Sequence, residues 1–284
     1  MGAMPLLLLV SIIWAFSFGL IKRLTGIDGA FLSATRLALA LLVFLPFLRV
    51  RDLAARTALA LAGIGAVQFG LMYLAYNESF RFLQSYEVAL FTLTTPVLVT
   101  LLADAFDRTV RPRSLLAALL AVLGAGCVVF KTAPGSGIAT GLVLVQLSNL
   151  AFALGQVLYR RQRARQPALR DRDVFGLLYA GALAVALPAT LARTDFATLP
   201  LTLPNIGVLL YLGLVASGLG FFLWNVGATR VNAGTLAAMN NAKIPLGIAV
   251  SLLFFGETAD APRLLASGVL MAVAVWVADG KSVS

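Results

Sequence analysis

The chain has 284 residues, of which 60% are hydrophobic and only 12% are charged, and its formal net charge is +10. Soluble domains average about 45–50% apolar and about 25% charged residues, so this composition excludes an ordinary soluble globular protein. Because positive charge is also what orients membrane proteins, we expect a lipid bilayer and no nucleic acid as the partner of the basic residues.

Ten apolar runs follow one another along the chain, with brief loops between them. A bilayer core about 30 Å thick needs roughly 20 apolar residues per helix. We therefore predict an all-α membrane protein with ten transmembrane helices, at residues 4–21, 29–48, 57–77, 85–103, 114–130, 139–159, 174–192, 205–228, 234–255 and 263–278.

The last five runs repeat features of the first five. The segment 15–19 (AFSFG) resembles 151–155 (AFALG), and an offset of 149 relates Arg81 to Arg230 and Pro96 to Pro245. Five spans per half invert the second half, so we predict two five-helix inverted repeats, residues 1–132 and 138–284. In transporters of this kind the substrate sits near the midplane where the halves meet. A structural scaffold or a channel is the alternative.

Basic residues are concentrated in alternate loops, with six of them between residues 160 and 172. The positive-inside rule then places both chain termini in the cytoplasm. The first apolar run has no Lys or Arg before it, so we expect it to be retained as a helix and not cleaved as a signal peptide.

Aromatic residues recur at helical spacing in the first and third runs. Trp14 and Phe18 are four residues apart, and Tyr73, Tyr76 and Asn77 fall at i, i+3 and i+4. These residues could line a cavity that stacks flat or apolar groups. An aromatic belt at the membrane interface explains them equally well.

Arg36 lies inside the second run, about a turn or two from its outer end. A charge within hydrocarbon is costly, so it needs a partner or an escape to the interface. We expect a structural pair with Glu87 or Glu78, or a side chain that reaches outward. Contact with the substrate is the alternative.

The fourth run carries Glu87, Phe91 and Thr94 at i, i+4 and i+7, followed by Pro96. Proline leaves the carbonyl four residues earlier without its donor, so we predict a helix break that frees the carbonyl of Thr92. Because the chain has no histidine, Glu87 is the candidate for proton coupling. A helix-start residue near the interface is the alternative.

Polar residues also form a stripe in the sixth run, where Gln146, Asn149 and Gln156 share one helix face. We weigh a cavity wall against interhelical hydrogen bonding, with the cavity favoured. In the eighth run, Phe221, Trp224 and Asn225 repeat the aromatic spacing of the third run.

The ninth run is the least lipid-like, because it holds Asn240, Asn241 and Lys243 before Pro245. We predict a second helix break at Pro245, which frees the carbonyl of Asn241. Lys243, with the two asparagines, could capture a substrate carboxylate. A gate or a static ion pair is the alternative.

Several chemistries have no support in the sequence. The chain has no histidine and one cysteine, Cys127, which excludes a Ser–His hydrolase and a Cys/His zinc site. We therefore expect no enzymatic activity, catalytic residue, metal or cofactor. Stripes of small residues in the fifth and seventh runs favour close helix packing and leave a monomer or a homodimer open.

Together these residues resemble the EamA-type members of the drug/metabolite transporter superfamily. The resemblance rests on Trp14 with Phe18 and Gly19, on Thr35-Arg36-Leu37, on the proline-containing fourth and ninth runs, and on Phe255-Gly256-Glu257. The first half departs from the pattern at Ala105-Phe106-Asp107, which lacks the Gly-Glu ending, and Lys243 is a charge not expected in a generic member.

The resemblance implies a multi-pass protein of the bacterial inner membrane that exports small metabolites by alternating access. Among known members the amino-acid exporters are the nearest, so we expect an amino acid as the substrate. Efflux of cationic or lipophilic drugs, with Glu87 and the aromatic residues holding the cation, is the alternative.

Overall fold

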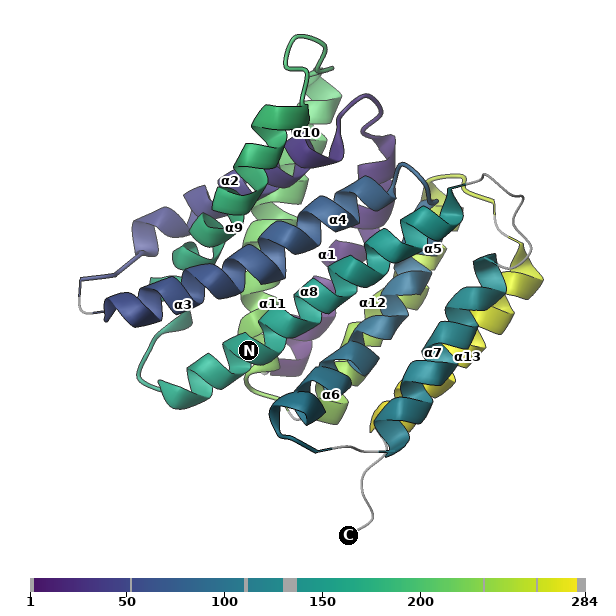
Figure 1. Cartoon of the computed structure of the whole chain (residues 1–284). Coiled ribbons are helices and arrows are strands. Elements are labelled where there is room, and N and C mark those ends of the chain that lie inside the picture. Colours follow the sequence, from purple (N-terminus) through teal and green to yellow (C-terminus); the bar gives the residue numbers. More distant parts are fainter. Residues whose placement is uncertain are drawn as a thin grey trace.

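The computed structural model describes residues 3–51, 53–109, 112–129, 137–231, 233–258 and 260–279. Within these ranges every regular element is helical, as the composition predicts (Figure 1). The described chain is therefore an all-α bundle.

The first half begins with α1 (Ala3–Arg23) and α2 (Gly29–Phe44), which ends in a 3-10 turn at Leu45–Phe47. α3 (Ala55–Gly65) continues through a π-helical segment, Ala66–Leu71, into α4 (Met72–Ser79). α5 (Ser85–Phe91) continues through a 3-10 turn, Thr92–Thr94, into α6 (Thr95–Phe106), and α7 (Pro112–Val129) follows.

The second half has the same order. It contains α8 (Ile138–Arg165), α9 (Asp171–Arg193) and α10 (Leu203–Leu210), which continues through a π-helical segment, Tyr211–Leu219, into α11 (Gly220–Ala228). α12 (Ala233–Phe254) and α13 (Ala261–Asp279) complete it.

Seven helical segments of the described chain are long and apolar enough to cross a membrane: Pro5–Arg23, Gly29–Phe47, Ala55–Ser79, Ser85–Phe106, Ile138–Arg165, Asp171–Arg193 and Leu203–Ala228. Two shorter apolar helices are Pro245–Phe254 and Leu264–Ala274. The chain is thus a multi-pass membrane protein, and the count of ten spans stays a prediction.

Corresponding helices of the two halves pack on the opposite half in the same way, so that the contacts are related by a two-fold exchange. α1 packs against α11 and α12, while α8, its counterpart, packs against α4 and α6. α3 packs against α9 in the same way that the π segment before α11 packs against α2. α2 lies against α9, and α7 lies along α13 at one side of the bundle (Figure 1). This exchange is the contact pattern of an inverted repeat.

The two π-helical segments occupy matching positions in the halves. Adding 149 to Ala66–Leu71 gives 215–220, which overlaps the second segment, Tyr211–Leu219. A π segment widens the helix, and its carbonyls can accept a second hydrogen bond from donors outside it. In the second segment, the hydroxyl of Tyr179 donates to the carbonyls of Ser217 at 2.7 Å and Gly218 at 3.0 Å.

Two glycines of the repeated AF-x-x-G segments let helices approach closely. A Cβ at Gly155 would collide with the side chain of Gln68 on the π segment after α3. A Cβ at Gly19 would collide with the ring of Phe255, just after α12. Each half therefore uses the same glycine to bring its first helix against the other half.

The predicted break at Pro245 is wrong. α12 is helical from Ala233 to Phe254 with Pro245 inside it. A proline removes one N–H···O bond but keeps a helical φ, and membrane helices tolerate the loss.

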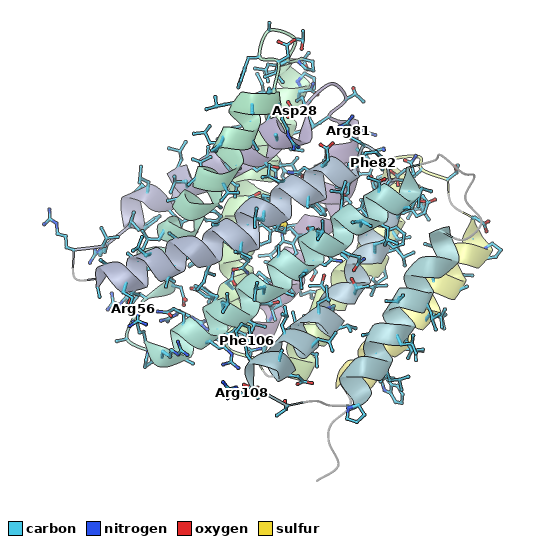
Figure 2. The ribbon with its side chains drawn as sticks, viewed as in Figure 1. Asp28, Arg56, Arg81, Phe82, Phe106 and Arg108 are labelled. Carbon is cyan, nitrogen blue, oxygen red and sulfur yellow. The ribbon has the colours of Figure 1, made fainter. Side chains whose placement is uncertain are left out.

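The bundle has two ends, which Figure 2 identifies by the residues it labels. Asp28, Arg81 and Phe82 lie at one end, here called the Asp28 end, and Arg56, Phe106 and Arg108 lie at the other, the Arg108 end.

α8 runs from the Asp28 end, where Gly137 lies against the ring of Phe82, to the Arg108 end, where Arg161 forms an ion pair with Asp107. α10 begins near the Asp28 end too, because Gly26 lies against Pro200 just before it. α8 and α11 are therefore parallel, and α3–α4 runs in the opposite direction.

Candidate substrate cavity

A cavity lies where the two halves of the bundle meet, between α1, α2, α4, α6, α8 and α11. It contains about 540 Å³ of space free of protein atoms, counting its open mouth. Transporters built from inverted repeats bind their substrates at such a position, where the two halves meet.

Aromatic residues from four helices make up much of the cavity wall: Trp14, Phe18, Tyr73, Tyr76, Phe152 and Phe221. The ring centroid of Phe221 lies 5.0 Å from that of Trp14, 5.6 Å from that of Tyr73 and 5.9 Å from that of Phe152. These spacings are typical of favourable aromatic pairs. The wall therefore offers a rigid apolar surface for a ring or an aliphatic chain.

Trp14 is fixed in place by the second half. Its Nε1–H donates to the carbonyl of Ala216 at 2.9 Å, within the π segment Tyr211–Leu219. Trp224 packs beside it at 5.1 Å and is fully buried. Trp224 therefore supports the wall from behind and does not line it.

Arg36 is the one cation among the described residues of the wall, and its residue is only 2% exposed. Nη2 donates to the hydroxyl of Tyr73 at 2.6 Å, Nε donates to Oγ of Ser217 at 3.0 Å, and Nη1 donates to Oδ1 of Asn77 at 3.4 Å. The guanidinium carbon also lies 4.1 Å from the centroid of the Tyr73 ring.

All of these partners are neutral. Within the part of the chain that the structure describes, no carboxylate pairs with Arg36, which differs from the expected pair with Glu87 or Glu78. Glu78 instead forms an ion pair with Arg81, three residues away. Glu87 accepts from the backbone N–H of Gln84 at 2.8 Å. Both carboxylates bind to groups close to them in the sequence. The buried charge of Arg36 at the cavity wall is therefore not compensated by a carboxylate of the described chain.

The break between α5 and α6 brings polar groups to the cavity edge. The carbonyl of Phe91 accepts from Nδ2 of Asn149 at 2.9 Å and from Nε2 of Gln146 at 3.3 Å. Thr94 donates to Oε1 of Gln146 at 2.6 Å and accepts from Nδ2 of Asn149 at 2.9 Å. The freed carbonyl is therefore that of Phe91, not that of Thr92, which accepts from the backbone N–H of Thr95.

This difference has a local cause. Pro96 is the second residue of α6, directly after the 3-10 turn. A 3-10 turn bonds i to i+3, so it uses the carbonyl of Thr92 and leaves that of Phe91 for the amides of α8.

Two carboxylates lie at the N-terminal end of α5, away from the cavity wall. Glu87 forms a capping box with Gln84. Glu257, just after α12, accepts from the backbone N–H groups of Ser85 at 2.9 Å and Tyr86 at 3.1 Å. Carboxylates at a helix start accept from its unpaired N–H groups and interact favourably with the positive end of the helix dipole. This geometry supports the helix-start interpretation of Glu87 rather than proton coupling.

A second cavity opens at the Asp28 end, next to the first. Its lining includes Lys22, Asp28, Asn77 and Arg81, and it contains about 940 Å³ of space, counting open solvent. Nζ of Lys22 donates to the carbonyls of Phe80 and Leu83, at 2.8 Å each. Asn77 lines this second cavity and accepts from Arg36 of the first, so its side chain connects the two.

Seven of the site residues proposed from the sequence line the first cavity: Trp14, Phe18, Arg36, Tyr73, Tyr76, Asn149 and Phe221. Asn77, Phe91, Thr94, Gln156 and Trp224 are buried around it without lining it. The side chains of Asn240, Asn241 and Lys243 lie outside the described residues.

The sequence pattern missed further residues of the wall: Ser17, Met72, Thr92, Thr95, Ser148 and Phe152. Phe152 could have been found, because it lies three residues after Asn149 on the polar face of α8. Ser148 is adjacent to that face. The sequence singles out Thr92 only for its carbonyl, and the others carry no sequence signal beyond their place in an apolar run.

Comparison with known proteins identifies relatives of both halves of the chain. The EamA-like transporter family matches residues 1–130 and 139–278. A solved crystal structure aligns with a TM-score of 0.67 and 18% identity over 97% of this chain and 96% of that one, which shows a shared fold.

Curated relatives match almost the whole chain. A protein of Pseudomonas aeruginosa named probable biotin transporter is 44% identical over 96% of both chains. The biotin transporter of Escherichia coli K12 is 39% identical over 96% of this chain and 92% of its own length. The biotin transporter of Salmonella typhimurium gives the same identity and coverage.

Proposed function

Because the chain belongs to the EamA-like transporter family, we propose that it is a secondary transporter that carries biotin across the bacterial inner membrane. The relatives that support this substrate are similar along nearly the full length of the chain. They give no support to amino-acid export, which the sequence led us to expect.

The observation that carries the proposal is the buried guanidinium of Arg36 at the cavity. A charge away from water is expensive unless an opposite charge compensates it. Arg36 has only neutral partners among the described residues, and its fork of N–H donors matches a carboxylate. A monocarboxylate such as biotin would neutralise it on binding, while the aromatic wall would cover the aliphatic chain and fused rings.

The same wall argues against the other substrates considered. The positive charge of an amino acid or a cationic drug would lie in the same buried cavity as the like charge of Arg36, with no carboxylate in the described lining to compensate the two. The described lining contains one arginine and no Asp or Glu. A substrate that is anionic at one end and uncharged elsewhere fits it better.

Transport would follow the two-fold exchange of the halves. With both termini in the cytoplasm, the Asp28 end faces outward and the Arg108 end faces the cytoplasm. Rocking of one half against the other would expose the cavity to each side in turn. Lys243 remains a candidate second cation for the carboxylate, which Lys243→Met would test through the half-saturating concentration of biotin.

Counterflow in proteoliposomes tests the proposal. Vesicles loaded with unlabelled biotin should accumulate labelled biotin from outside, in a saturable manner, and protein-free vesicles should not. A panel of labelled amino acids serves as the matched comparison. Accumulation of an amino acid without accumulation of biotin would overturn the substrate assignment, and non-saturable flux would indicate a channel.

A further inference from the structure

A layer of three buried side-chain amides lies beside the substrate cavity without lining it. Gln68, Gln156 and Asn225 come from three helical spans and are 0%, 1% and 1% exposed. Nε2 of Gln68 donates to Oδ1 of Asn225 at 3.2 Å, and Nδ2 of Asn225 donates to the carbonyl of Phe221 at 3.1 Å.

The layer lies one helical turn beyond the cavity, toward the Arg108 end. The rings of Phe152 and Phe221 meet across the parallel helices α8 and α11. Gln156 and Asn225 each follow these phenylalanines by four residues, so they lie one turn further along the same helix faces. Gln68 precedes the cavity residue Met72 by four residues on a helix that runs the other way, which gives it the same depth.

Gln156 has unusual hydrogen bonding for so buried a side chain. Neither Nε2 nor Oε1 has a hydrogen-bond partner in the described chain, and Oε1 of Gln68 has none either. Buried amides that lack partners are costly and rare in folded proteins. The layer thus holds open donor and acceptor capacity, which is not needed to connect the helices.

This capacity matches one class of chemical group. A carbonyl flanked by N–H groups, as in a cyclic urea or an amide, both accepts and donates hydrogen bonds. The layer presents carboxamide N–H donors and carbonyl acceptors and no charge. An ion would find no opposite charge among these three side chains.

We propose that Gln68, Gln156 and Asn225 form a second binding position, which takes the urea group of the substrate when Phe152 and Phe221 separate. This inference rests on the proposed function. Gln68 lies five residues before Tyr73, which binds Arg36, and most of the intervening chain belongs to the π segment Ala66–Leu71. A molecule with a carboxylate at one end and a urea at the other would span from Arg36 past the aromatic pair to the amides.

The test compares biotin with the thiolane pentanoic acid that keeps its carboxylate, chain and sulfur ring but lacks the urea. Both compete with labelled biotin in counterflow. For the unaltered protein, we expect biotin to compete at least about tenfold better than the acid, because a site with open polar groups rejects an analogue that cannot pair with them. In Gln156→Leu, this preference should fall by about tenfold while competition by the acid is unchanged. Gln162→Leu, on the same helix but outside the layer, should keep the preference.

The experiment distinguishes failure of the proposed function from failure of this inference. If the unaltered protein does not accumulate biotin, the proposed function is wrong and this inference falls with it. If it accumulates biotin and folded Gln156→Leu keeps the full preference, only this inference is wrong, and the amides are packing groups whose loss changes thermal stability alone. Gln156→Asn, which keeps an amide but shortens it, replaces the leucine variant if that variant does not fold, and the same loss of preference is expected.

Discussion

The side chain of Arg36 contacts Tyr73 in two ways, since Nη2 donates to the phenol oxygen at 2.6 Å and the guanidinium carbon lies 4.1 Å from the ring centroid. The phenol oxygen also lies 2.8 Å from Oγ of Ser217, which belongs to the other half of the chain. Tyr73 therefore orients the cation and connects it to both repeats.

Removal of the Tyr73 hydroxyl should weaken substrate binding without removing the ring. A hydrogen bond to a charged group contributes about 1.5–3 kcal/mol. We therefore expect Tyr73→Phe to raise the half-saturating concentration of biotin by about tenfold in counterflow. Tyr211→Phe is the control, because it deletes a hydroxyl that donates to the carbonyl of Ile13 outside the cavity wall. Equal effects of the two variants would contradict the orienting role.

Substitution of Arg36 should separate charge from geometry. Truncation of one partner in a buried, hydrogen-bonded charge pair costs about 2–5 kcal/mol. Arg36→Gln should therefore raise the half-saturating concentration of biotin by about a hundredfold or more. Arg36→Lys keeps the charge but not the planar fork, and we expect an intermediate effect.

The control for Arg36 is Arg81→Gln, which removes an exposed arginine whose ion pair with Glu78 lies at the protein surface. Surface pairs of this kind contribute about 0–1 kcal/mol. Unchanged biotin affinity in Arg36→Gln would show that the carboxylate binds elsewhere, with Lys243 as the next candidate.

The helices could be predicted from the sequence because bilayer thickness fixes how long an apolar run must be. The predicted span 57–77, for example, corresponds to the continuous segment Ala55–Ser79. The π-helical stretch within it could not be predicted, since an apolar run has the same composition whichever carbonyl each N–H selects. The repeat offset did locate its counterpart once the first π segment was known.

The aromatic part of the cavity could be predicted from helical spacing, whereas the environment of Arg36 could not. Its partner Ser217 is 181 positions away. A sequence shows which buried charges need partners, but it does not show which carboxylates are already bound by other groups. Here Glu78 and Glu87 are engaged by Arg81 and Gln84, within three residues of each. For that reason Arg36 does not form the expected ion pair with either glutamate.

The contact between Glu257 and the start of α5 predicts a stability effect. Glu257 accepts from two backbone N–H groups across 171 and 172 positions of the chain, so it joins the end of α12 to α5. Loss of a helix cap costs about 0.5–2 kcal/mol. Glu257→Ala should lower the free energy of unfolding by about 1 kcal/mol, measured by thermal unfolding in detergent. Glu78→Ala, which loses only a surface ion pair, should change it less, and the reverse order would contradict the capping role.

Close helix approach at Gly155 gives the last prediction. A Cβ at this position would collide with the Cα, Cβ and Cγ of Gln68, so a backbone atom as well as the side chain would have to shift. Overpacking of a tight contact costs about 1–3 kcal/mol, so Gly155→Ala should lower the free energy of unfolding by that amount. At Gly207, by contrast, a Cβ would meet nothing within 4 Å. Alanine is a better helix former than glycine by up to about 1 kcal/mol, so Gly207→Ala should be neutral or stabilising. Thermal unfolding of the two variants side by side measures the difference, and a Gly155→Ala protein as stable as Gly207→Ala would show that α8 does not pack on the Gln68 segment this closely.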